Sequence, residues 1–190
     1  MTPTKLQDAA LARFAVQGYE STTLQEIASD VGLAKPSIYT HFKSKDELYL
    51  SLIPILIDLE LNYARSVITG GKGTRRQIYQ YLSSISQRFN SPYHMKFWIR
   101  SFWMPPVHLE SQVLGPFNRF MESLEDIIRI AILHSPLIEN DKKMNAATLA
   151  NICMCFIDCL QSELLYGGDA KYQRRLKTVW KFFNSAVRLT

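Results

Sequence analysis

The sequence predicts an all-α protein in two parts, an N-terminal helix-turn-helix unit of three helices and a larger C-terminal helical domain, with about nine helices in total. Three observations predict this fold: apolar residues recur at helical spacing in every long segment, no segment alternates as a strand does, and capping or breaking residues separate the segments. With 190 residues, 47% of them apolar, the chain can bury a sizeable core. We place the two domains at residues 1–48 and 49–190.

Capping residues mark the starts of the first two helices. Thr4 stands three residues before Gln7, which predicts a capped helix start, and Gly18 predicts the end of that helix. Thr23 stands three residues before Glu26 and predicts the start of a second helix. Two helical segments are therefore expected before residue 32.

The stretch from residue 22 to residue 48 carries a helix-turn-helix pattern. Ala28, Gly32 and Ile38 fall four and then six residues apart. A small residue lets two helices approach closely, a glycine tolerates a positive φ between them, and a branched apolar residue packs the second helix on the first. We therefore expect a third, short helix that begins near Ala34.

The third helix should expose hydrogen-bond donors and an aromatic ring but no acid. Its exposed residues are expected to be Lys35, Ser37, Tyr39, Thr40 and His41. The formal net charge of +5 lies mostly outside residues 1–50, which hold five basic and six acidic residues, yet residues 31–45 contain three lysines and no carboxylate. Because the walls of a DNA groove are anionic, this local charge favours double-stranded DNA as a partner.

A third capping pattern, Ser44 with Glu47, predicts the start of a long helix over residues 45–68. The glycine-rich residues 70–73 lack the GxxxxGK[ST] order of a phosphate-binding loop, and a helix rather than a strand precedes them. We therefore interpret them as a helix stop. Five further helices are expected at residues 74–90, 93–104, 110–134, 142–166 and 171–189.

Four pieces of the first fifty residues form a denser pattern: FAVQGYESTTLQEIA, VGLAK, SIYTHF and FKSKDEL. Together they resemble the DNA-binding domain of the TetR family of bacterial transcriptional regulators, over about a quarter of the chain. The resemblance implies a homodimeric repressor. Each protomer would insert one recognition helix into the major groove of a palindromic operator, and a small molecule bound in the C-terminal domain would release it.

The resemblance also implies roles for single residues. Tyr39 and His41 are similar to a pair that contacts the DNA backbone, and Lys45 is similar to a lysine that meets a phosphate at a helix start. Thr23 resembles a backbone-contacting hydroxyl at the start of the supporting helix. With the rest of the exposed face, the DNA-binding residues expected are Thr23, Lys35, Pro36, Ser37, Tyr39, Thr40, His41 and Lys45.

Three of these residues, Lys35, Pro36 and Ser37, are similar to positions that often face base edges in the family. A lysine can donate hydrogen bonds to guanine O6 and N7. Ala34 is a departure, because many members of the family carry a serine there. One hydroxyl that caps the helix or contacts a phosphate is therefore missing, and more of the DNA affinity is expected to come from the remaining contacts.

A ligand pocket is expected among the dense aromatic and methionine side chains of residues 93–121. The helix at 93–104 is apolar nearly all round and should be buried, the Pro105-Pro106 break frees local backbone, and His94, His108 and Asn118 offer polar anchors. Many of these aromatic side chains must also serve as core. The predicted lining residues, which favour a small hydrophobic effector, are Trp98, Phe102, Phe117, Phe120, Met121 and Phe156.

As in the family, the last two helices are expected to form the dimer interface. Both carry apolar stripes, and two protomers that pair such helices form a four-helix bundle with two-fold symmetry. The basic residues of the last helix are expected to be a solvated face. The stripe residues are Leu149, Ile152, Phe156, Leu160, Leu164, Val179, Phe183 and Val187.

Catalysis is not indicated by the sequence. No Ser/His/acid or Cys/His pairing, metal-ligand cluster or glycine-rich nucleotide loop is visible, so we expect no catalytic residues, no metal and no cofactor. The three cysteines, Cys153, Cys155 and Cys159, lie in a helical pattern without a histidine nearby and are interpreted as small buried residues in a reducing compartment.

A cytoplasmic location without a membrane span is expected. No secretory signal is visible, and the most apolar stretch, residues 48–57, is too short to cross a bilayer. The main alternative function is a constitutive or architectural DNA-binding dimer without an effector, and a helix-turn-helix that serves only protein contacts is another. A cavity of several hundred Å³ behind the DNA-binding helices would favour the ligand-responsive form.

Overall fold

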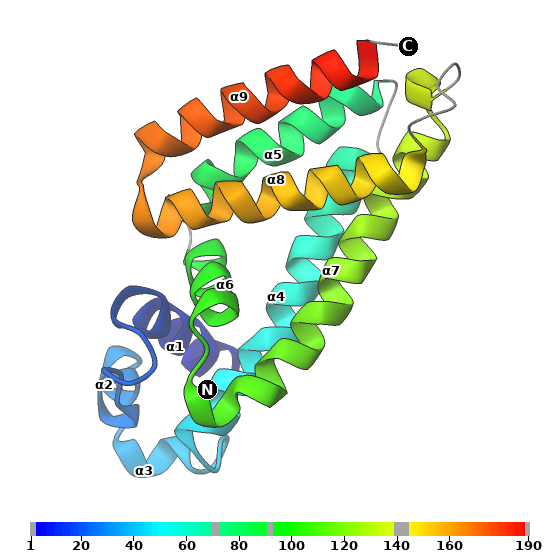
Figure 1. The fold of residues 1–190 in the computed structure, drawn as a ribbon. Helices are drawn as coiled ribbons and strands as arrows, with labels where there is room; N and C mark the ends of the chain where they lie inside the picture. The colour runs from blue at the N-terminus through cyan, green and yellow to red at the C-terminus, as the bar shows by residue number, and fades with distance from the viewer. Residues whose placement is uncertain (1–2, 70–72, 91–92, 139–144, 189–190) are drawn as a thin grey trace. The chain divides into compact units, whose positions relative to one another are not determined.

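The computed structural model describes residues 3–69, 73–90, 93–138 and 145–188 (Figure 1). Over these ranges the chain forms nine α-helices and two short 3-10 helices, and no strand. The predicted all-α fold class with an N-terminal helix-turn-helix is confirmed. Most of the predicted glycine break (residues 70–72) and the predicted first residues of the eighth helix (142–144) lie outside the described residues.

The helices fall close to their predicted ranges. The first four are α1 (Pro3–Gln17), α2 (Leu24–Asp30), α3 (Lys35–Ile38) and α4 (Lys45–Ile68). The others are α5 (Thr74–Asn90), α6 (His94–Trp103), α7 (Glu110–Leu133), α8 (Ala146–Tyr166) and α9 (Asp169–Arg188), with 3-10 helices η1 (Val107–Leu109) and η2 (Pro136–Ile138).

The chain divides into two compact units. Unit 1 comprises Met1–Asp58 and Arg88–Asn118, and unit 2 comprises Leu59–Gln87 and Arg119–Thr190. Unit 1 thus combines the three N-terminal helices with the start of α4, with α6 and with the start of α7. The functional boundary after residue 48 stays a prediction.

The core of unit 1 holds the helix-turn-helix together. Helix α1 packs on α2 and on α6, and α2 packs on α3. The side chains of Phe14, Ile27 and Ile38 are at most 2% exposed. Helices as short as α2 and α3 are marginal alone, so burial of such side chains, at about 1.5–3 kcal/mol each, accounts for most of their stability.

Two of the three predicted capping patterns are confirmed. The Thr23 hydroxyl accepts the Glu26 backbone N–H at 3.2 Å, and the Glu26 carboxylate accepts the Thr23 backbone N–H at 2.8 Å. The Ser44 hydroxyl accepts the Glu47 backbone N–H at 3.0 Å. The prediction for Thr4 is wrong, because α1 begins at Pro3 and Thr4 already lies inside the helix.

Helix α6 is less buried than its composition predicted. Its residues Phe97, Trp98 and Ile99 are buried, but Trp103 is 38% exposed. Lys96 and Arg100 stand four residues apart on the chain, and both are only half-buried. Two long cationic side chains at this spacing share one face of a helix and keep that face near water, so α6 has one buried face rather than apolar surroundings on all sides.

The core of unit 2 joins α5, α8 and α9. Helix α8 packs on α9, and Gly168, with φ of +76°, forms the turn between them. Tyr172 of α9 is fully buried, and its hydroxyl donates to the backbone oxygen of Leu82 in α5. The Ser86 hydroxyl of α5 also donates to the Asp169 carboxylate at the start of α9. These bonds attach α9 to α5 at one end.

The apolar stripes of α8 and α9 pack inside their own protomer. The stripe residues that are less than 9% exposed in the single chain are Leu149, Phe156, Leu160, Leu164, Phe183 and Val187. The prediction that these six side chains contact a second protomer is therefore wrong. A helix period identifies the apolar face, and here that face is used by the core of unit 2.

Helix α8 also departs from two other expectations. Cys153 is buried as predicted, but Cys155 is exposed and Cys159 is half-buried. By length and composition α8 is the one described helix apolar enough to cross a bilayer, and half of its apolar window is buried inside the protein.

Candidate nucleic-acid interface

The turn between α2 and α3 has the geometry that its sequence predicted. Gly32 has φ of +69°, which favours glycine, and its N–H donates to the Ser29 oxygen at 3.1 Å. The Leu33 N–H donates to the Ala28 oxygen at 2.8 Å and ends α2. Ala28 and Ile38 are fully buried, so the small and the branched residue join the two helices.

Helix α3 and the turn that follows it expose most of the predicted DNA-binding residues. Lys35, Pro36, Thr40 and His41 are exposed, and the Tyr39 side chain is 51% exposed. The other two residues of this segment behave differently. Ser37 is half-buried, and Ala34, at the helix start, makes no side-chain capping bond. The Thr40 hydroxyl donates to the Ser37 backbone oxygen at 2.8 Å, which leaves its own oxygen to accept a bond.

Two acids of the supporting helix are paired with one arginine of α1. Arg13 donates to both carboxylate oxygens of Asp30 at 2.7 Å and to Glu26 at 3.2 Å. The bond from Arg13 lowers the pKa of Asp30, and the backbone N–H of Thr23 is the main cause that lowers the pKa of Glu26. The acids beside α3 are therefore charged and paired, and Arg13 offsets one of their two negative charges next to the lysines of α3 and of the following turn.

Lys45 lies at the start of α4 and is held by the loop that follows α1. Its ammonium group donates to the backbone oxygens of Tyr19 at 2.9 Å and Thr22 at 3.0 Å, and it lies 4.0 Å from the centroid of the Tyr19 ring. This anchoring role was not predicted from the sequence. Thr23, the other predicted contact outside α3, is exposed but engaged in its capping box.

A polar cluster connects the same loop to α4 and to η1. The Tyr19 hydroxyl donates to Asp46, and the Nε2 atom of His108 lies 3.4 Å from the other Asp46 oxygen. The bond from Tyr19 is the main cause that lowers the pKa of Asp46. Burial, followed by the bond to Asp46, raises the pKa of Tyr19, so the phenol stays protonated. Three segments distant in sequence are thus joined next to the helix-turn-helix.

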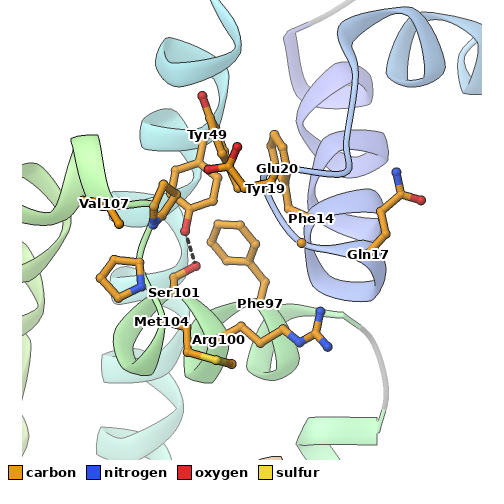
Figure 2. A pocket seen from close by; sticks show the side chains of 13 residues that line it. Phe14, Gln17, Tyr19, Glu20, Tyr49, Phe97, Arg100, Ser101, Met104 and Val107 are labelled. Atoms are coloured by element: carbon orange, nitrogen blue, oxygen red, sulfur yellow. Dashed lines mark hydrogen bonds between the residues drawn. The ribbon is translucent and has the colours of Figure 1, made fainter.

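A cavity of about 420 Å³ lies in unit 1 behind these groups, between α1, α4 and α6 (Figure 2). Its aromatic side chains come from Phe14, Tyr19, Tyr49 and Phe97, whose neighbouring ring centroids lie 5.1–6.2 Å apart. The remaining lining residues are Gln17, Gly18, Glu20, Arg100, Ser101, Met104, Pro105, Pro106 and Val107. The cavity is partly open to solvent.

The six residues predicted to bind a ligand lie elsewhere. In unit 1 the ring of Phe117 contacts Trp98 and Phe102, with centroids 4.2 and 5.4 Å apart, and both Trp98 and Phe117 are buried. In unit 2 Phe120 and Phe156 are buried and Met121 is half-buried. None of the six lines the 420 Å³ cavity. A ligand site at these residues stays a prediction.

A metal site finds no support in the described residues. Over these ranges no three His, Cys, Asp or Glu side chains are grouped so that they could hold a metal ion. An exposed, acid-free short helix on a rigid helix-turn-helix support, joined to a helical body, defines the class of helix-turn-helix DNA-binding proteins.

Residues 6–52 match the family described as bacterial regulatory proteins of the tetR family, which confirms the resemblance. The N-terminal domain of this chain is therefore of the tetR type.

Two curated relatives match the same domain. Over 54 residues, or 28% of this chain, the identity is 43% with the uncharacterized HTH-type transcriptional regulator YerO of Bacillus subtilis. It is 39% over 54 residues with IcaR, the HTH-type negative transcriptional regulator of the biofilm operon icaADBC in Staphylococcus aureus. The chain spans 19% of YerO and 29% of IcaR, so the likeness is confined to one domain.

A solved structure extends the likeness in fold over nearly the whole chain. A putative transcriptional regulator from Saccharomonospora viridis, crystallised in complex with choline, superposes with a TM-score of 0.80. The comparison covers 96% of this chain and 95% of that one at 17% sequence identity. The two chains therefore share a fold.

Proposed function

We propose that this chain is a cytoplasmic transcriptional repressor that binds a palindromic operator as a homodimer and is released by a small hydrophobic effector. The observation that carries this proposal is the exposed face of α3, which offers donors and no carboxylate on a supported helix-turn-helix. The family domain supports DNA binding, and the description of IcaR as a negative regulator supports repression. The role proposed is not enzymatic.

The residues of α3 and of the turn after it would make different kinds of contact with DNA, according to their chemistry. Lys35 and Ser37 would face base edges beside Pro36, because a lysine donor can bond guanine O6 and N7. Tyr39 and His41 would donate to phosphate oxygens, which fixes the register of the helix in the groove. The Thr40 hydroxyl would accept or donate a hydrogen bond at the same wall of the groove.

Thr23 and Lys45 would contribute mainly by position. The Thr23 hydroxyl is bonded within its capping box, and the Lys45 ammonium donates to two backbone oxygens. The Lys45 side chain nevertheless lies at the N-terminus of α4, where an ammonium group and the backbone dipoles would both stabilise a phosphate. Both residues would therefore hold a backbone-binding surface in place next to α3.

A dimer through α8 and α9 would use the faces that the core of unit 2 leaves exposed. On α9 the Phe182 side chain is 59% exposed, although it is large and apolar. On α8 the exposed Cys155 and the half-buried Cys159 and Ser162 follow one another at helical spacing. Small residues let the helices of two protomers approach closely, and a large apolar residue supplies area to bury.

The ligand-responsive form is favoured over a constitutive DNA-binding dimer by the 420 Å³ cavity. A cavity of this size suits a small molecule, and its wall includes Phe14 and Tyr19 of the helix-turn-helix support. The choline complex of the Saccharomonospora viridis regulator also supports a ligand-responsive role for this fold.

Selection of bound duplexes from a randomised DNA pool tests the DNA-binding role. A palindrome with half-sites about one helical turn apart is expected, and fluorescence anisotropy should give tighter binding to it than to a scrambled duplex. Lys35→Met should lose this preference, and Lys171→Met, the same change at an exposed site in α9, should keep it. Recovery of no consensus, or equal effects of the two variants, would contradict the proposal.

A further inference from the structure

The cavity between α1, α4 and α6 has an aromatic floor. Phe14, Tyr49 and Phe97 are only 1–3% exposed, and Figure 2 shows their side chains converging on the same space. Met104 and Val107 are largely exposed and form part of its rim. Such a floor accepts a flat apolar group, because aromatic rings pack in offset or edge-on contacts with another ring.

The polar groups of the floor are already bonded to each other. The Tyr49 hydroxyl donates to the Ser101 hydroxyl at 2.8 Å. Burial raises the pKa of Tyr49 to about 12, so this phenol stays neutral and keeps its proton at physiological pH. At the side of the cavity the Gln17 amide donates to the Ser21 backbone oxygen at 2.9 Å. These groups orient a ligand little and carry no charge.

Arg100 supplies the one cationic side chain of the lining. Over the described residues its guanidinium has one hydrogen-bond partner, the backbone oxygen of Val16, which Nη1 reaches at 3.0 Å. A guanidinium has five N–H donors, so most of the donors of Arg100 remain available to a carboxylate. Glu20 also lines the cavity, but it is exposed, whereas Arg100 is half-buried and less hydrated. The stronger charge anchor is therefore the cation.

We propose that this cavity is a binding site for a small aromatic carboxylate, with its ring on the floor and its carboxylate paired with Arg100. The volume of about 420 Å³ lies within the range of about 300–1,000 Å³ that small-molecule sites occupy. The site differs from the six residues that the sequence nominated, since none of them contributes to its lining.

Occupancy of the site would act on the helix-turn-helix through Tyr19. This ring lines the cavity, and the same residue bonds Asp46 and lies against Lys45 at the start of α4. A ligand that displaces Tyr19 would therefore disturb the loop that positions α2. This regulatory step depends on the proposed function, whereas the binding step does not.

Calorimetric titration with three probes of one shape tests the binding step: 2-naphthoate, 2-naphthamide and 2-naphthylmethylamine. The acid should bind about 10- to 100-fold more tightly than the neutral amide, as charged hydrogen bonds do, and the amine should bind most weakly. Arg100→Met should remove the preference for the acid. Lys96→Met, which deletes a cation from the same helix but outside the cavity, should retain it.

Several results would overturn the assignment. They are equal binding of the three probes, tightest binding of the amine, no binding at millimolar concentration, or a loss of preference in Lys96→Met as large as in Arg100→Met. The three probes are compared on the unchanged protein, so a folding defect in a variant does not decide the outcome.

Operator binding separates this inference from the proposed function. With the selected palindrome, 2-naphthoate should weaken DNA binding of the unchanged protein about tenfold and should not affect the Arg100→Met variant. If the acid binds as expected and DNA affinity does not change, the regulatory step is wrong. If no duplex is bound even without the acid, the proposed function fails and the titration still tests the site.

Discussion

Arg13 of α1 and Asp30 at the end of α2 form a two-point ion pair, with both N–H···O distances at 2.7 Å. The same guanidinium reaches Glu26 at 3.2 Å. This arrangement fixes α2 on α1 and offsets one of the two negative charges beside the helix proposed to enter DNA. The orientation and the electrostatics of the reading surface thus depend on one side chain outside it.

Replacement of Arg13 by methionine should affect DNA binding more than folding. The Arg13 and Asp30 side chains are 30% and 35% exposed, and exposed ion pairs add little to stability, so the free energy of unfolding should change little. The two unpaired acids should weaken DNA binding at low salt, with the difference shrinking as salt rises. Arg129→Met, which breaks an exposed pair with Asp126 in α7, is the matched control. Equal anisotropy curves for the two variants would contradict this expectation.

Replacement of Thr23 should show whether its hydroxyl acts as a cap. Thr23→Ala should lower the unfolding free energy by about 1 kcal/mol, because the N–H of Glu26 loses its partner. Thr23→Ser retains the hydroxyl and should recover most of the stability in urea denaturation, and most of the DNA affinity as well. A serine variant as unstable as the alanine variant would assign the effect to the methyl group.

The sequence predicted those features of the fold that depend on local pattern. Ala28, Gly32 and Ile38 specify the helix-turn-helix within eleven residues, and the structure places them as expected. The cavity could not be predicted in this way, because Tyr19 and Arg100 stand 81 positions apart in the numbering and no periodicity relates them. The sequence features that could have pointed to the cavity were the tyrosines in the first fifty residues and the Pro105-Pro106 break.

The stripes of α8 and α9 show a second limit of sequence patterns. Phe156 and Phe183 have the spacing of an interface, but their ring centroids lie 6.4 Å apart inside one protomer. An apolar period indicates that a face is buried and does not indicate which chain covers it. The roles of the predicted DNA-binding residues likewise depend on DNA, and the sequence indicates this partner only through the charge and the hydrogen-bond donors of those residues.

Substitution at Tyr39 should weaken binding to every DNA sequence. A phosphate contact carries no sequence information, so Tyr39→Ala should reduce affinity about equally for the operator and for a scrambled duplex. Tyr79→Ala, at an exposed tyrosine of α5, should leave both affinities unchanged. Loss of operator binding alone in Tyr39→Ala would show instead that this ring contacts a base.

Acid should reduce the stability that the hydrogen bond between Tyr19 and Asp46 contributes. The hydrogen bond from Tyr19 lowers the pKa of Asp46 below its ordinary value of 3.8. The folded state therefore holds this carboxylate charged more readily than the unfolded chain does. Its contribution to stability is complete above that ordinary value and is lost as the pH falls through the lowered pKa.

The measurement is the melting temperature between pH 5 and pH 3, in unchanged protein and in two variants. Asp46→Asn and Tyr19→Phe should both flatten the fall of the melting temperature with acid, because each removes the main cause of the shift. Tyr79→Phe, outside the cluster, should keep the full slope. A Tyr19→Phe variant with an unchanged slope would assign the acid sensitivity to other groups.

Substitution at Phe182 should separate the protomers of the proposed dimer. Its side chain is 59% exposed on α9, so aspartate there costs the isolated chain little but places an unpaired charge in a buried interface. Sedimentation velocity should give a dimer for the unchanged protein and a monomer for Phe182→Asp. Val107→Asp, at an 87% exposed residue of unit 1, should remain dimeric. Because a palindrome is bound by two coupled protomers, the monomer should also lose the preference for a full operator over a half-site. A Phe182→Asp protein that stays dimeric would place the interface on another face.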